Sequence, residues 1–351
     1  MNNRELYVLE GPDAWLGSEL EKDERWQLRF DEADLRDIDA AVSFSRNNGQ
    51  DWSSMTSKKD FPLPVLSKKL SHVAAELEQG CGLVNIKGLP VGQYDDADLN
   101  RICYGIGLNL GTPLFQNYSG ELLRDITNEL QDTDAVNENR LYAKDGSVFH
   151  SSRARTASNA ALRFHTDRAD VVGLLCVRQA EKGGLSQIAS SVRVNNEIVR
   201  QRPDLARLLY EEIYRSRHGE EKNGSQMTYG IPVFGVRNGK FTSHYSRTYV
   251  EAAQELENVP RMSDKQWEAL DLLAEVAQEV SMEMRLEPGD IQLLNNHVIY
   301  HARSSYEDGT NQRCLKRIWL SMPNSRALPK EQAILWRNVE AGETRGGIAQ
   351  A

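Results

Sequence analysis

Apolar residues recur every three or four positions in several stretches of the chain, the spacing that puts side chains on one face of a helix. This pattern predicts helices over residues 64–79, 96–109, 192–210 and 264–280. Pro203 is expected to break or kink the third of these helices, and Ser263 begins a capping box for the fourth. The apolar stripe of the fourth helix is interpreted as core-facing rather than as a cofactor surface.

Shorter apolar runs between the helices predict strands. Residues 82–87 form one such run, and the continuous run 171–177 is typical of a buried strand. The turn at Asn238-Gly239 predicts a β-hairpin within 213–249. A second hairpin is expected where the segments MEMRL and IQLLN flank the turn 287–290. This mixture of helices and strands indicates the α+β class.

Polar composition divides the chain into one main unit and two smaller ones. Residues 1–62 are polar and charged and are predicted to form a peripheral helical and loop segment packed on the core. The main domain is predicted to span 63–330, followed by a C-terminal tail over 331–351. Within the main domain, the polar stretch 131–160 is typical of a long loop, either an active-site lid or a mobile surface loop without a role.

The composition is that of a soluble globular protein, with 40% hydrophobic and 26% charged residues. A net charge of −9 argues against nonspecific nucleic-acid binding, which needs a basic surface. No apolar run reaches the length of a membrane span, and the N-terminus lacks the features of a secretory signal. The four cysteines have no metal-binding spacing and are expected to be free thiols in a reducing cytoplasm. A homo-oligomer is left open.

Two segments that lie far apart in the sequence carry the residue types of a metal site. The first reads FHTD and contains His165 and Asp167, which share a face if the segment is an extended strand. The second reads NNHVIYHAR and contains His301. Two imidazoles and one carboxylate are the facial-triad ligands of Fe(II), and they leave positions open for O2 and a chelating cosubstrate. His297, four positions before His301, competes for the third ligand position.

Two arginines, Arg313 and Arg317, follow the second segment in the sequence RCLKR. With Asp167 ionised, an Fe(II) site carries one net positive charge, and a dicarboxylate such as 2-oxoglutarate adds two negative charges. One arginine then balances the assembly, because a guanidinium grips a carboxylate through two parallel hydrogen bonds. These residues therefore predict Fe(II) as the metal, with 2-oxoglutarate and O2 as cosubstrates.

Several segments in order resemble the TauD/TfdA branch of Fe(II)/2-oxoglutarate-dependent oxygenases, with the character of its clavaminate synthase-like subgroup. These segments are 82–90, 107–116, FHTD, Gly183-Gly184-Leu185-Ser186, 289–301 and RCLKR. The resemblance implies a double-stranded β-helix core, which is a jelly-roll or cupin-like fold, with flanking helices. It also implies that His301 is the distal ligand and that His297 is a supporting or packing residue.

The same resemblance assigns the cosubstrate-binding residues. It implies that the Ser186 hydroxyl assists the far carboxylate of 2-oxoglutarate, that Arg317 clamps this carboxylate, and that Arg313 is its upstream companion. The sequence departs from the family pattern at Ser186, where threonine is common, and at Asn295, where many members have aspartate. Neither change removes the chemistry.

The implied activity is hydroxylation of an unactivated C–H bond in a small metabolite, coupled to decarboxylation of 2-oxoglutarate to succinate and CO2. Desaturation, epoxidation or cyclisation would use the same ligands, while a zinc hydrolase and a non-catalytic jelly-roll binding protein are alternatives from other classes. An anionic or amino-acid-like substrate is expected if Arg163 shares a strand face with His165. Gln116 and Asn117 are further candidates for the substrate pocket, with a structural loop role as the alternative for both.

Overall fold

Two β-sheets lie at the centre of the fold in this computed structural model, which describes residues 6–49, 51–129, 141–142, 148–149, 156–217 and 227–348. The larger sheet has the strand order β1 (Gln27–Arg29), β2 (Leu83–Lys87), β16 (Ile291–Asn295), β8 (Val171–Arg178), β19 (Cys314–Ser321) and β3 (Thr112–Pro113), and β4 (Leu123–Ile126) also pairs with β19. The smaller sheet has the order β15 (Met282–Met284), β10 (Ser186–Ser190), β17 (Ile299–Arg303) and β7 (Leu162–His165).

The described residues also form four two-stranded pairs. They are β11 (Ile213–Ser216) with β12 (Thr228–Ile231), β13 (Phe234–Arg237) with β14 (Lys240–Ser243), β9 (Lys182–Gly183) with β18 (Tyr306–Glu307), and β5 (Leu141–Tyr142) with β6 (Val148–Phe149). The antiparallel pair β13–β14 confirms the hairpin expected around Asn238-Gly239. Both turn residues adopt positive φ, as a two-residue hairpin turn requires.

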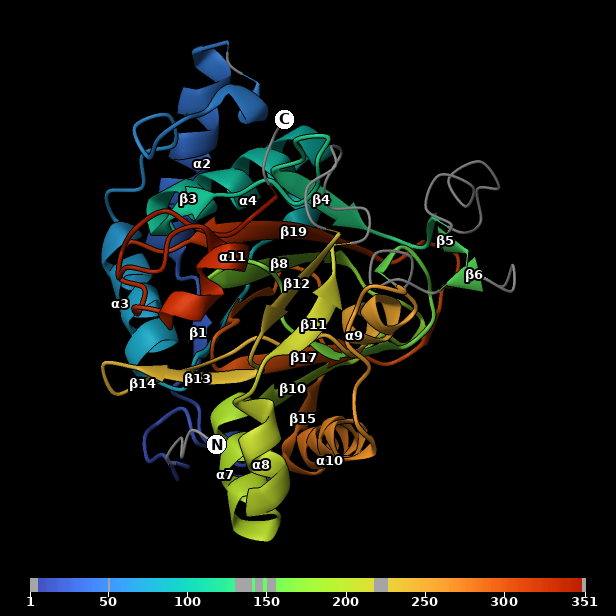
Figure 1. Cartoon of the computed structure of the whole chain (residues 1–351). Coiled ribbons are helices and arrows are strands. Elements are labelled where there is room, and N and C mark those ends of the chain that lie inside the picture. The colour runs from blue at the N-terminus through green and yellow to red at the C-terminus, as the bar shows by residue number, and fades with distance from the viewer. Residues whose placement is uncertain are drawn as a thin grey trace.

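Helices cover the outer face of each sheet (Figure 1). The larger sheet packs against α2 (Glu32–Asn47), α3 (Ser67–Gln79) and α4 (Asp96–Leu110), while the smaller sheet packs against α7 (Ser191–Gln201), α8 (Pro203–Leu209) and α10 (Asp264–Val280). The other α-helices that the structure describes are α1 (Gly17–Leu20), α9 (Arg247–Gln254) and α11 (Ala333–Trp336). Along β8, Val171 and Leu175 face the helices while Val172 and Leu174 face the interior between the sheets.

The chain changes sheet at each turn between β15, β16 and β17. β15 belongs to the smaller sheet, β16 to the larger sheet and β17 to the smaller sheet again. The predicted hairpin of MEMRL and IQLLN is therefore wrong, since these two segments lie in different sheets. The turn between them carries the chain across to the other sheet, and this alternation between sheets gives the double-stranded β-helix that the family resemblance implied.

The long helical and strand predictions agree with the structure. The helix predicted over 192–210 is split, because α7 ends at Gln201 and α8 starts at Pro203, where the missing amide hydrogen is tolerated. The capping box at Ser263 is present at the start of α10. All four cysteines are free and buried.

Some predictions are not tested by the fold. Most of the stretch 131–160, the candidate lid, lies outside the described residues. The division into 1–62, 63–330 and 331–351 stays a prediction, although β1 from the first segment pairs with β2 of the larger sheet. Among the described helices, none is long and apolar enough to cross a membrane.

Gly289→Ala should destabilise the fold by about 3 kcal/mol, because Gly289 lies in the crossing turn with a φ of +93° and its backbone approaches Leu89 closely. An added Cβ would meet the Leu89 carbonyl oxygen at 2.1 Å. The matched control is Gly239→Ala, which has a φ of +74° but nothing within 4 Å, so only the backbone cost of about 1–2 kcal/mol applies. Urea unfolding measures both variants, and equal losses would contradict the crowded turn.

Candidate metal centre and cosubstrate site

Three residues predicted to bind metal come together between the two sheets. His165 ends β7 and pairs directly with His301 on β17, and Asp167 follows His165 by two residues. Their ligand atoms all lie within 4.8 Å of one another, and all three residues are buried. The distances from Asp167 to His165 and to His301 are 3.8 and 3.7 Å, measured to the Nε2 atom of each ring.

Neighbours hold His165 and Asp167 so that a ligand atom of each stays available, whereas the buried Nδ1 of His301 has no hydrogen-bond partner among the described residues. The Nδ1 atom of His165 contacts the carbonyl oxygen of Arg163 at 2.9 Å, which directs its Nε2 toward Asp167. The backbone amide of Asp167 donates to Asn296 Oδ1 (3.0 Å), and Trp319 Nε1 donates to Asp167 Oδ2 (3.0 Å). Within the described residues, the other oxygen of Asp167 has no hydrogen-bond donor in range.

Burial and nearby charge set the protonation states that a metal site requires. Burial lowers the pKa of His301 to about 3, with a contribution from His165, and burial also lowers the pKa of His165. Burial alone would raise the pKa of Asp167, but Arg317 and the two histidines hold it below its usual value. Two neutral imidazoles and one carboxylate are the donor set that suits Fe(II), so the residues fit the predicted metal.

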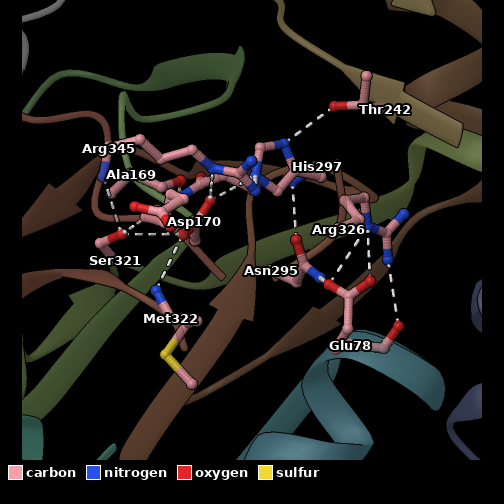
Figure 2. Close-up of polar contacts among 12 residues, drawn as sticks. Glu78, Ala169, Asp170, Thr242, Asn295, His297, Ser321, Met322, Arg326 and Arg345 are labelled. Carbon is pink, nitrogen blue, oxygen red and sulfur yellow. Dashed lines mark hydrogen bonds and ion pairs between the residues drawn. The ribbon is translucent and has the colours of Figure 1, made fainter. Parts of the chain in front are cut away.

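His297 does not face this site. It lies in the turn between β16 and β17, where its Nε2 contacts Asp170 at 2.8 Å and its Nδ1 contacts Thr242 at 2.9 Å (Figure 2). Arg345 shares the same carboxylate through its Nε at 2.7 Å. The interpretation of His297 as a packing or supporting residue agrees with this geometry.

The predicted cosubstrate residues line one cavity beside the triad. Ser186, Arg313 and Arg317 form part of its wall, together with Leu174, Leu286 and Leu315. Arg317 lies close to the metal ligands, with its Nη1 3.9 Å from Asp167 Oδ1. Arg313 contacts Gln179 at 3.1 Å and stacks 5.1 Å from the ring centre of Tyr306, and its buried Nη1 has no hydrogen-bond partner among the described residues.

Gln116 supports Arg317 instead of facing the cavity. Its Oε1 accepts a hydrogen bond from Arg317 Nε at 2.7 Å, and its Nε2 donates to the Arg317 carbonyl oxygen at 2.8 Å. Asn117 folds back on its own loop, where it contacts Ser119 and Glu121. The structure thus places Gln116 against Arg317 and Asn117 against its own loop, and a substrate-binding role for either stays a prediction.

Arg163 points away from the triad because a β-bulge breaks the alternation of β7. His165 pairs with His301 and Leu162 with Arg303, so three positions on β7 correspond to two on β17. The expected sharing of a face between Arg163 and His165 is therefore wrong. The Arg163 guanidinium instead donates to Glu251 at 2.7 Å and to Thr248 at 3.0 Å, both on α9.

Trp319 and Asn296 are contacts of Asp167 whose roles the sequence reasoning missed. Trp319 stands two positions after Arg317 on β19, so the alternation of strand side chains places it on the same inward face. This spacing of two residues from Arg317 could have identified Trp319 from the sequence. Asn296 is the second residue of the segment NNHVIYHAR, but its hydrogen bond with the Asp167 amide joins residues 129 apart in the sequence.

The double-stranded β-helix and its inward-facing triad define an Fe(II)/2-oxoglutarate-dependent oxygenase. Within this class, the chain belongs to the family described as taurine catabolism dioxygenase TauD, TfdA, whose model matches residues 48–319. FR-33289 synthase of Streptomyces rubellomurinus is 29% identical over 332 residues, which cover 91% of this chain and 92% of that protein. The taurine hydroxylase-like protein SAT17 of Stachybotrys chartarum is 27% identical and covers 87% of this chain and 77% of its own length.

Solved structures with the same fold are more distant in sequence. An asparagine oxygenase in complex with Fe(II), 3-hydroxyasparagine and succinate has a TM-score of 0.61 at 15% identity, covering 84% of this chain and 93% of its own. The non-heme iron oxygenase OrfP in complex with Fe and α-ketoglutaric acid has a TM-score of 0.53 at 17% identity, with the same coverage of 84% and 93%. Fe(II), 2-oxoglutarate and O2 are thus the cofactor and cosubstrates of this family.

The stability of the iron-free protein should fall as pH drops from about 6.5 toward 4, and His297 should contribute to this fall. Burial, together with Arg345, lowers the pKa of His297 to about 4, although Asp170 opposes the shift. The unfolded chain therefore binds this proton first, which costs at most about 1.4 kcal/mol per pH unit in that window. Urea unfolding at pH 7, 6 and 5 should give a shallower pH dependence for His297→Gln than for the wild type. The surface variant His72→Gln is the control, and identical slopes for the wild type and His297→Gln would refute the assignment.

Proposed function

We propose that the chain hydroxylates an unactivated C–H bond of a small anionic or amino-acid-like metabolite, with His165, Asp167 and His301 as the Fe(II) ligands. The observation that supports this most directly is the buried triad, whose Asp167 oxygen and ring nitrogens converge on one point. When bound, iron and 2-oxoglutarate would supply the oxidising chemistry. The protein residues hold the ligands in a facial arrangement, and the apolar wall of Leu174, Leu286 and Leu315 excludes water.

We propose roles for the two arginines that differ from the expectation that Arg317 clamps the far carboxylate of 2-oxoglutarate. A cosubstrate chelated at its keto end extends away from the metal, so its far carboxylate needs a cation at some distance from the triad. Arg317 lies 3.9 Å from Asp167, which places it beside the chelated end. Arg313 lines the same cavity with a buried, unpartnered Nη1, and so we assign the clamp to Arg313 with Ser186 as its partner.

Charge in the cavity favours an anionic group on the substrate. The ion, Asp167 and 2-oxoglutarate together carry one negative charge, and the three arginines that line the cavity, Arg303, Arg313 and Arg317, turn this into two net positive charges. A carboxylate on the substrate would offset one of them. Amino-acid substrates are consistent with this charge, since the solved relatives bind 3-hydroxyasparagine and (3S)-hydroxy-L-arginine.

Anaerobic addition of Fe(II) and then 2-oxoglutarate to the metal-free protein tests the proposal. The wild type should develop the visible charge-transfer absorption of an Fe(II)–2-oxoglutarate chelate, and O2 should then yield succinate. His165→Ala and His301→Ala should lose both signals, because each removes one ligand of the ion. His297→Gln should keep both signals, since its contacts are to Asp170 and Thr242. A zinc hydrolase or a binding protein would give no band in the wild type.

Cosubstrates that lack the far carboxylate separate the roles of the two arginines. Pyruvate should bind the wild type roughly a hundredfold more weakly than 2-oxoglutarate, because it leaves Arg313 buried without an anion. Arg313→Gln should abolish this discrimination, whereas Arg317→Gln should retain it while changing the absorption band. The dissociation constants come from titration of the band, and the opposite pattern would return the clamp to Arg317.

A further inference from the structure

The segment 343–348 contacts the loop that follows Asp167 and forms neither a helix nor a strand. Four exposed residues, 341–344, lead into Arg345, Gly346, Gly347 and Ile348, which are all buried. A buried irregular segment must find partners for its backbone groups within the protein. Two of its amides bond to Ser321 and Trp336, and two others bond to loops that carry residues of the proposed active site.

Arg345 is the anchor of this segment. Its side chain is fully buried, and its Nε donates to Asp170 Oδ1 at 2.7 Å (Figure 2). The other oxygen of Asp170 accepts from the amide of Met322 at 2.9 Å, and His297 contacts the same carboxylate as Arg345. Asp170 lies three residues after the metal ligand Asp167, so Arg345 holds the loop that carries this ligand.

The backbone amides of Gly347 and Ile348 tie the same segment to two separate loops. The amide of Gly347 donates to the carbonyl oxygen of Arg168 at 2.7 Å, immediately after Asp167. The amide of Ile348 donates to the carbonyl oxygen of Phe115 at 2.8 Å, immediately before Gln116. A Cβ on Gly346 would meet the Arg168 oxygen at 2.7 Å, and one on Gly347 would meet Leu114 Cβ at 2.9 Å.

Gln116 connects this contact to the cosubstrate site, because it forms two hydrogen bonds with Arg317. One short segment therefore touches the loop of the metal ligand and the loop that orients the arginine beside it. Asp167 and Arg317 come from segments 150 residues apart in sequence, and their separation of 3.9 Å depends on how these two loops are placed.

We propose that residues 345–348 are a positioning element of the catalytic site, which fixes Asp167 through Arg168 and Asp170 and fixes Arg317 through Phe115 and Gln116. The inference rests on the proposed roles of Asp167 and Arg317. Arg345 is a positioning residue, since it reaches the reacting groups only through Asp170.

A nearby buried arginine provides a matched control. Arg326 also lies near the C-terminal end of the chain, and its side chain is 1% exposed and pairs with Glu78 on α3 at 3.0 Å (Figure 2). Its Nη1 donates to the Phe241 carbonyl oxygen at 2.6 Å. These partners belong to neither active-site loop. Arg326→Gln should therefore lower stability without loosening the metal loop.

The experiment compares Arg345→Gln, Gly347→Ala and Arg326→Gln in the full chain by two measurements. Hydrogen–deuterium exchange of the metal-free protein should rise at least tenfold in peptides covering 164–170 and 114–117 for the first two variants only. Anaerobic titration should give the same two variants at least tenfold weaker Fe(II) and 2-oxoglutarate binding, with a shifted charge-transfer band. Arg345→Lys, which restores the charge, should recover part of both effects.

The outcomes distinguish this inference from a general loss of stability. Unchanged exchange and unchanged binding in Arg345→Gln and Gly347→Ala would overturn it, and so would equal effects from Arg326→Gln at a matched melting temperature. If Arg345→Gln does not fold, Gly347→Ala and Arg345→Lys are compared with Arg326→Gln instead. A wild type that shows no charge-transfer band would refute the proposed function, whereas the exchange measurement would still test whether the segment holds the two loops.

Discussion

The direct pairing of His301 with His165 across β17 and β7 is the constraint on which the site depends. In an antiparallel pair, opposed residues share one face, so both rings point into the space between the sheets. A slip of one residue in this register would turn His301 toward the outer helices and bring Tyr300 or Ala302 inward. The apolar outward positions of β17, buried against α7, resist that slip. The hydrophobic core therefore determines where the metal ligands meet.

Much of this architecture could be predicted from the sequence, because the signals are local. Helix periodicity located α3, α4 and α10, and Pro203 marked the break between α7 and α8. The triad followed from residue types and spacing, and the family resemblance supplied the fold that brings the two segments together. These features depend on short stretches of chain or on a shared pattern, and neither requires knowledge of a particular long-range contact.

The two predictions that were wrong, and one contact that was not predicted, all depended on long-range geometry. The turn 287–290 looks like a hairpin turn, but whether it reverses the chain or crosses to another sheet is decided by which strands β16 joins. The face of Arg163 depends on a bulge that arises between β7 and β17. The supporting role of Gln116 depends on its approach to Arg317, 201 residues away. No local pattern encodes these three facts.

Two clusters among the described residues contain histidine and aspartate, and the number of donors around each carboxylate explains why only one of the two fits a metal. Asp170 accepts from the Met322 amide, the Ser321 hydroxyl and Arg345, and it also contacts His297. Its lone pairs are thus committed to protein groups. Among the described residues, the Asp167 side chain has only Trp319 as a close donor, while Arg317 stands at 3.9 Å. A buried carboxylate left with an open oxygen is costly unless a cation completes it. The same residue types therefore stabilise the fold at Asp170 and leave a place for Fe(II) at Asp167.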